Sequence, residues 1–133
     1  MGQIVAVINQ KGGVGKTTST VNLAFGLSQL GKKTLLIDMD PQGNASSGLG
    51  LKRHDYIDRN IYHVLIGEKT MSEVIQPTGV PNLDIVISNN DLVGAEIELV
   101  DVPQREYMLK KALANHQDQF DYILIDCPPS LGM

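Results

Sequence analysis

The chain has 133 residues, of which 42% are hydrophobic and 20% are charged. Its 11 Lys and Arg residues stand against 15 Asp and Glu, which gives a formal net charge of −4. This composition excludes a disordered chain, which combines few apolar residues with a high net charge. The acidic balance also lacks the basic surface of a dedicated nucleic-acid-binding domain. The length predicts one domain or less.

Cysteine and apolar content exclude further classes of protein. The single cysteine, Cys127, cannot form an intramolecular disulfide or an all-cysteine zinc site. His54, His63 and His116 lack the spacing of metal ligands. No apolar run approaches the ~20 residues of a membrane span, and residues 1–8 lack the basic start of a signal peptide. We therefore expect a cytoplasmic protein that does not contact membranes.

Four short apolar runs predict strands: residues 3–8, 33–38, 82–87 and 121–126. The first, second and fourth are nearly continuous in Ile, Val and Leu, which is typical of parallel strands covered on both faces. The third alternates more clearly, and we expect it nearer the edge of the sheet.

Helical patterns lie between these runs. Residues 16–30 carry an apolar face at helical spacing, and Gly31 stands where the helix should end. The predicted face comprises Val21, Ala24, Phe25 and Ser28, widened by Leu23, Leu27 and Leu30. Thr70 and Glu73 have the spacing of a capping box, so a short helix should begin there and end before Pro77.

Two more helices are expected over residues 90–99 and 104–116. Strands that alternate with helices predict an α/β fold, with a mostly parallel sheet and right-handed crossovers. Residues 40–58 are rich in Gly, Ser and Asn and show no period, so we expect a long loop there. Loops of that length in small domains are usually functional or mobile.

The strongest functional signal is KGGVGKTT at residues 11–18, between the first predicted strand and the first helix. Glycines at this position let backbone N–H groups converge on an anion, and the start of a helix adds partial positive charge. In such a loop Lys16 reaches the β- and γ-phosphates and the Thr17 hydroxyl binds Mg²⁺. The predicted phosphate-binding residues are Lys11, Gly12, Gly13, Val14, Gly15, Lys16, Thr17 and Thr18, with Thr18 near the α-phosphate. The alternative is a glycine-rich turn that only caps the helix.

The loop departs from the common pattern G-x-x-x-x-G-K-S/T, because Gln10 occupies the position of the first glycine. With a lysine at its second position, the loop resembles the deviant Walker A motif of the ParA/MinD family of dimerising ATPases. The resemblance implies that Lys11 crosses a dimer interface and contacts phosphates bound by the partner subunit. A solvated lysine on a flexible loop is the alternative.

Two further segments narrow the resemblance. LLIDMDPQGN at residues 35–44 resembles the ParA/Soj branch of chromosome- and plasmid-partitioning ATPases, since MinD-type members usually lack the PQGN continuation. ILIDCPPSL at residues 123–131 resembles the Walker B region of the family, and DLVGAEIEL at residues 91–99 is consistent but less specific. The implied fold is a P-loop NTPase, a mostly parallel sheet flanked by helices, and the implied cofactors are ATP and Mg²⁺.

Three aspartates at strand ends suit phosphoryl transfer, which depends mainly on charge neutralisation and positioning. Asp126 is placed to hold Mg²⁺, through water. The resemblance implies that Asp40 orients the attacking water, and Asp38 could support the outer shell of the metal. The predicted catalytic residues are therefore Lys11, Lys16 and Asp40, and the predicted metal ligands are Thr17, Asp126 and Asp38. A turn or helix-capping role is the alternative for each aspartate.

Family members continue beyond the Walker B segment, so the resemblance implies that residues 1–133 are the N-terminal part of one ParA-like ATPase domain. The implied function is an ATP-dependent homodimer that switches during DNA partitioning, with a ParB-like centromere-binding partner. Non-specific DNA would be bound through later residues, on the nucleoid. A MinD-like membrane-associated regulator and a fragment that does not hydrolyse ATP are the alternatives. The first strand, without a neighbour from the later part, would be an open edge that favours self-association.

Overall fold

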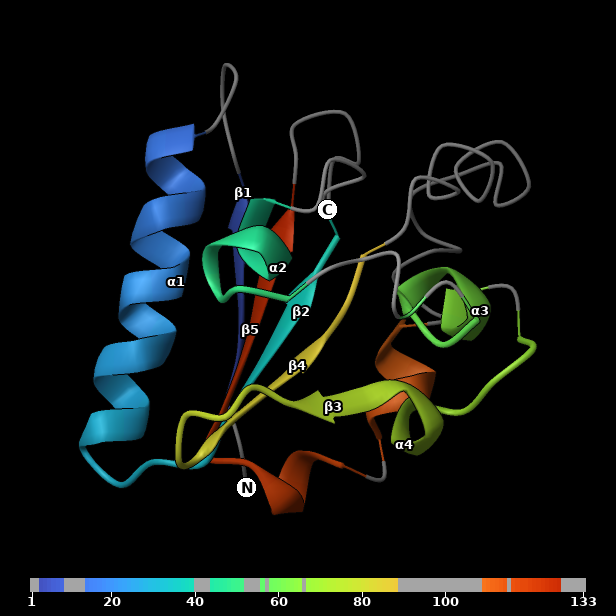
Figure 1. Cartoon of the computed structure of the whole chain (residues 1–133). Helices are drawn as coiled ribbons and strands as arrows, with labels where there is room; N and C mark the ends of the chain where they lie inside the picture. The colour runs from blue at the N-terminus through green and yellow to red at the C-terminus, as the bar shows by residue number, and fades with distance from the viewer. Residues whose placement is uncertain are drawn as a thin grey trace.

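The computed structural model describes residues 3–8, 14–39, 44–51, 56, 58–65, 67–88, 109–114 and 116–127. Five strands form one sheet in the order β1-β5-β2-β4-β3 (Figure 1). Neighbours in the run β1-β5-β2-β4 are parallel, and β3 pairs antiparallel with β4. The strands are β1 (Gln3–Ile8), β2 (Thr34–Asp38), β3 (Ile75–Pro77), β4 (Leu83–Val86) and β5 (Tyr122–Cys127). The mostly parallel α/β fold is confirmed.

All four predicted strands are present, with slightly shifted ends. The short strand β3 was not predicted, because a three-residue strand that ends in proline gives almost no periodic signal. β4 lies one strand in from the edge that β3 forms, which agrees with its expected place.

Helices cover both faces of the sheet. On one face α1 (Val14–Gln29) lies along the strands with α2 (Asn44–Gly48) beside it (Figure 1). On the other face lie α3 (Ile61–Leu65), α4 (Met71–Val74) and a helical turn at residues 109–113. A 3₁₀ helix, η2 (Gln117–Gln119), precedes β5.

Several predicted helices differ from those in the structure. α2 lies inside the segment that we expected to be a loop, so that expectation is wrong for residues 44–48. The helix expected over 104–116 is confirmed at 109–113, and the helix expected over 90–99 lies outside the described residues. α3 was not predicted.

The predicted apolar face of α1 is only partly correct. The residues that are fully buried against the sheet are Thr20, Ala24 and Ser28, spaced four apart along the helix. Leu23 and Phe25 are exposed, and Leu30 is 75% exposed. Small side chains at Thr20, Ala24 and Ser28 let the helix lie close to the strands, and the half-buried Val21 and Leu27 pack against the same half of the core. Counting apolar residues alone therefore made the predicted face too wide.

α1 ends and α4 begins where the sequence predicts. Gly31 adopts φ +80°, which suits a residue without a Cβ, and the Lys32 N–H donates back to the Leu27 carbonyl at 3.1 Å. At α4 the Glu73 carboxylate accepts hydrogen bonds from the Thr70 N–H at 2.9 Å and from Oγ1 of Thr70 at 3.2 Å. These bonds hold the pKa of Glu73 below its usual value.

The core has two halves, one on each face of the sheet. Side chains alternate along β2, so Leu35 and Ile37 join the half under α3 and α4, and Leu36 joins the half under α1. β2 and β5 are buried on both faces, as expected. For β1, cover on both faces is not seen: Ile4 and Val5, on opposite faces, are each 38% exposed, which agrees with the open edge expected for this strand. Among the described strands β1 pairs only with β5.

Candidate nucleotide-binding site

The site is built at the carboxyl edge of the parallel strands. β1, β5 and β2 all end at this edge, α1 begins there, and α2 lies beside it (Figure 1). In open parallel sheets ligands bind outside the carboxyl ends of the strands. The edge also receives the start of a 16-residue helix, whose first N–H groups lack partners within the helix. This geometry suits an anionic group such as a phosphate.

Two of the predicted aspartates lie together at this edge. Asp38 and Asp126 are register partners on the adjacent strands β2 and β5, and both are 0% exposed. Leu36 and Leu124, two residues earlier in each strand, belong to the half of the core under α1. Because side chains alternate along a strand, Asp38 and Asp126 face α1 and α2 as well.

Contacts from the helices agree with this direction. Oδ2 of Asp38 accepts the backbone N–H of Ser46 at 2.9 Å and the Ser46 hydroxyl at 2.7 Å, both from α2. Oδ1 of Asp126 accepts the Thr20 hydroxyl, from α1, at 3.4 Å. The backbone carbonyl of Asp126 also accepts the Met39 N–H at 2.9 Å, which extends the pairing of β2 with β5 past Asp38. Two helices and two strands therefore meet at the carboxylate pair.

Residues 14–18 of the predicted loop form the first turns of α1, and their backbone is described. Position 17 lies three residues before Thr20, a spacing that puts both positions on the same side of a helix. The side chains of Val14, Lys16, Thr17 and Thr18 lie outside the described part. Lys11, Gly12, Gly13 and Asp40 also lie outside it.

Thr20 and Ser46 are site residues that the sequence analysis missed. Each had a signal. Thr20 is a polar residue four positions after Lys16, on what proves to be the buried stripe of α1. Ser46 lies two residues after the PQGN segment that the sequence analysis singled out.

The donor set fits Mg²⁺ better than a transition metal. Within the described part of the chain, no group of three or more His, Cys, Asp and Glu side chains could hold a metal. Mg²⁺ is usually bound through one or two carboxylates and completed by phosphate oxygens and water. The pair Asp38 and Asp126 matches that requirement.

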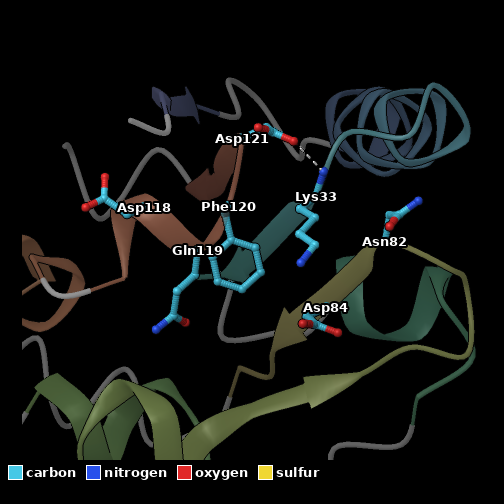
Figure 2. A pocket seen from close by; sticks show the side chains of 7 residues that line it. All are labelled: Lys33, Asn82, Asp84, Asp118, Gln119, Phe120 and Asp121. Carbon is cyan, nitrogen blue, oxygen red and sulfur yellow. Dashed lines mark hydrogen bonds between the residues drawn. The ribbon is translucent and has the colours of Figure 1, made fainter.

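A hollow lies at the opposite side of the sheet from this site, where β2, β4 and β5 begin (Figure 2). Its volume is about 610 Å³, and its described lining is Lys33, Asn82, Asp84, Asp118, Gln119, Phe120 and Asp121. Partial burial raises the pKa of Asp84, and the nearby positive charge of Lys33 offsets part of that shift. Asp121 accepts the Lys33 backbone N–H at 2.9 Å, drawn as the dashed line in Figure 2. None of these lining residues is one that the sequence singled out.

A family model described as an AAA domain, AAA_31, matches residues 2–133. The chain belongs to this AAA domain family.

Similar members of the family include partitioning proteins. Soj of Bacillus subtilis, a sporulation initiation inhibitor protein, is 50% identical over 133 residues, which are 100% of this chain and 52% of that protein. The chromosome-partitioning ATPase Soj of Treponema pallidum is 53% identical, over 100% of this chain and 51% of that protein. The chain therefore spans about half the length of the curated relatives that it matches. These matches confirm the resemblance to ParA/Soj partitioning ATPases.

A solved structure matches the fold of this AAA domain. It is cobyrinic acid a,c-diamide synthase of Mycobacterium smegmatis with a bound ATP analogue and magnesium, at 40% identity and a TM-score of 0.89. The match covers 99% of this chain and 53% of that chain. The P-loop NTPase fold expected from the sequence is thereby confirmed.

Proposed function

We propose that this chain is the nucleotide-binding part of an ATPase that acts as a dimerisation switch in chromosome or plasmid partitioning. The carboxylate pair supports this most directly: Asp38 and Asp126 are fully buried, side by side, next to the start of α1. Buried charges are retained where they are hydrogen-bonded or coordinate a metal. A Gly-Lys-Thr sequence in the first turn of that helix makes MgATP the ligand that this edge suits best.

Each residue has a proposed role. The backbone of residues 11–18 and the ammonium of Lys16 bind the phosphates, while Thr17 and Asp126 hold Mg²⁺ and Asp38 supports them. Mg²⁺ held there would neutralise the charge that develops on the phosphates. Asp40 orients the attacking water, and Lys11 contacts phosphates held by the partner subunit.

The proposal extends to the whole protein. We place residues 1–133 in the N-terminal part of a longer ATPase domain, because Soj proteins of twice this length match throughout the chain. A ParB-like protein stimulates hydrolysis, and residues beyond this segment bind non-specific DNA, so that the ATP dimer resides on the nucleoid in the cytoplasm. In the described part of the chain, no helix has the length and apolarity to cross a membrane.

Two alternatives predict different behaviour. A MinD-like regulator would act at a membrane, but the PQGN segment at residues 41–44 and the identity to Soj favour partitioning. A protein that binds nucleotide without hydrolysing it would show affinity and no turnover.

The test compares substitutions of the two loop lysines, Lys11 and Lys16, made in the longer protein to which we propose that this chain belongs. Lys16→Ala removes a charge-assisted contact to phosphate of the kind worth ~1.5–3 kcal/mol, so MgATP affinity should fall ~10- to 100-fold. Lys11→Ala should leave monomer affinity nearly intact but abolish ATP-dependent dimerisation and turnover. Calorimetry with MgATP gives the affinities, and sedimentation with a non-hydrolysable analogue gives the dimer.

Unchanged MgATP affinity in Lys16→Ala would contradict the phosphate-loop assignment. Normal dimerisation of Lys11→Ala would contradict the contact of Lys11 with the partner subunit and favour the alternative, a solvated lysine. Lys32→Ala is the matched control, because this exposed lysine lies at the far end of α1.

A further inference from the structure

A buried hydrogen-bonded pair joins the end of β2 to the start of α2. Asp38 is the last residue of β2 and Ser46 the third residue of α2, and both side chains are 0% exposed. One carboxylate oxygen, Oδ2 of Asp38, accepts both the Ser46 N–H at 2.9 Å and the Ser46 hydroxyl at 2.7 Å. Both hydrogen-bond donors of Ser46 are therefore satisfied by one buried carboxylate oxygen.

The pair closes a short stretch of chain. Asp38 and Ser46 are eight residues apart in sequence. On the strand side, the Met39 N–H donates to the Asp126 carbonyl at 2.9 Å, and Met39 is fully buried. On the helix side, Ala45 is buried in the half of the core under α1. The backbone is thus fixed at residue 39 and again at residue 45.

Asp40 stands one residue after the first fixed point. The positions between the two fixed points, residues 40–44, begin with the aspartate to which we assign the attacking water. A carboxylate that orients water must be held within a fraction of an ångström of its productive position. Hydrogen bonds that involve a charged group are about twice as strong as neutral ones, so the Asp38–Ser46 pair is a strong tie between the end of β2 and the start of α2.

We propose that Ser46 is a positioning residue: through Asp38 it fixes the end of β2 and the start of α2, which flank Asp40 in the sequence, in the positions required for hydrolysis. This inference rests on the proposed ATPase function. It gives Asp38 a definite task, since Oδ2 anchors α2, beyond general support of the metal. It also predicts that loss of the Ser46 hydroxyl affects the chemical step more than nucleotide binding.

The test uses a series at position 46 in the protein that carries this chain. Ser46→Ala removes the hydroxyl donor, and kcat should fall ~10-fold or more while the affinity for MgATP stays within ~2-fold. Ser46→Thr retains the hydroxyl and should keep kcat within ~3-fold of the parent. If Ser46→Ala does not fold, Ser46→Cys takes its place, because a thiol has a similar size but is a weak donor, and kcat should again fall.

Ser28→Ala is the matched control. Ser28 is also buried, and its hydroxyl donates to the Phe25 carbonyl at 2.6 Å, but it lies near the other end of α1. Its loss should lower the melting temperature and leave kcat unchanged. Equal losses of kcat in Ser46→Ala and Ser28→Ala would show a general effect of destabilisation and overturn the inference.

Three other outcomes are decisive. Parent-like kcat in folded Ser46→Ala would overturn the inference and leave the proposed function intact. A raised Mg²⁺ requirement in Ser46→Ala, with kcat restored at high Mg²⁺, would assign the pair to the metal and also overturn it. A parent protein that neither binds nor hydrolyses ATP would overturn the proposed function itself, and that result is read from the parent alone.

Discussion

Asp38 and Asp126 occupy equivalent register positions but have different surroundings. Asp38 accepts two hydrogen bonds from Ser46 at 2.9 and 2.7 Å, whereas the Thr20 hydroxyl lies 3.4 Å from Asp126. Two short bonds to one carboxylate oxygen of Asp38 restrain that side chain relative to α2. At the scale of single residues, Asp38 is therefore a good candidate for an anchor of α2.

Asp40 gives the first prediction at this scale. A carboxylate that orients water contributes more to the transition state than to substrate binding. In the protein that carries this chain, Asp40→Ala should bind MgATP and dimerise, but hydrolyse ATP at least ~10²-fold more slowly, as expected on losing a positioned acid–base group. Single-turnover hydrolysis measures the rate. The dwell time on DNA should lengthen, because we expect release to depend on hydrolysis.

Asp58→Ala is the control for that experiment. Asp58 is a surface aspartate, 74% exposed at its side chain, that pairs with Arg59 at 3.4 Å. Such pairs contribute little, so turnover should not change. Turnover of Asp40→Ala at the parent rate would show that another residue orients the water, with Asp38 the next candidate.

At the scale of elements, the short helix α4 depends on its first residues. It has four residues, and the Glu73 carboxylate bonds back to the N–H and hydroxyl of Thr70. A helix this short is marginal without capping or packing. Met71 and Val74 supply the packing, since both are buried in the half of the core under α3 and α4.

Glu73→Gln should therefore lower the melting temperature at pH 7. The hydrogen bonds from the Thr70 N–H and hydroxyl depress the pKa of Glu73 below its usual value. A carboxylate with a depressed folded-state pKa stabilises the fold above its unfolded-state pKa, and this stabilisation is lost as pH falls through the folded-state pKa. The difference between parent and variant should thus be present at pH 7 and vanish well below pH ~4.5. Thermal melts across that range measure it.

Glu68→Gln is the matched control, because Glu68 is exposed and its side chain makes no hydrogen bond to any described residue. It should melt like the parent at every pH. A Glu73→Gln difference that persists unchanged at low pH would show that packing, and not the charge of Glu73, stabilises α4.

The sequence could predict those features of the helices that are caused by interactions between residues close together in the chain. The capping box at Thr70 and the stop at Gly31 act within one turn, so both were readable. The buried face of α1 depends on which side chains fit against the sheet, and apolar counting placed the exposed Leu30 inside it. α2 is held by the hydrogen bond from Ser46 to Asp38, which lies eight residues earlier on β2. No local period in the sequence therefore predicted this helix.

The candidate site divides in the same way. Asp38 and Asp126 were predicted from strand ends and family motifs, and the parallel register brought them together. Their partners Thr20 and Ser46 come from helices on the same face, and the sequence alone does not say which turn of α1 meets β5. The roles of Lys11, Lys16 and Asp40 stay predictions for the experiments above.

At the scale of the whole molecule, the two edge strands of the sheet, β3 and β1, differ in their tendency to pair further. The edge strand β3 is short and antiparallel and ends in Pro77, and proline in an edge strand discourages further pairing. The other edge strand, β1, has six residues, and its Ile4 and Val5 are partly exposed. Long apolar edge strands without charges are templates for pairing with another chain.

The 133-residue chain by itself should therefore associate through β1. Two copies related by a twofold axis would pair their β1 strands antiparallel and continue the sheet. Ile4→Lys adds a positive charge to this edge strand in each copy, which opposes their pairing, and the dissociation constant should rise ~10-fold or more. Leu30→Lys also replaces an exposed apolar side chain with a charge, but on the end of α1, and should not change it. Sedimentation from ~10 μM to ~1 mM covers the range in which exposed edges associate. A chain that stays monomeric throughout, or equal weakening in both variants, would show that β1 is not the surface that pairs.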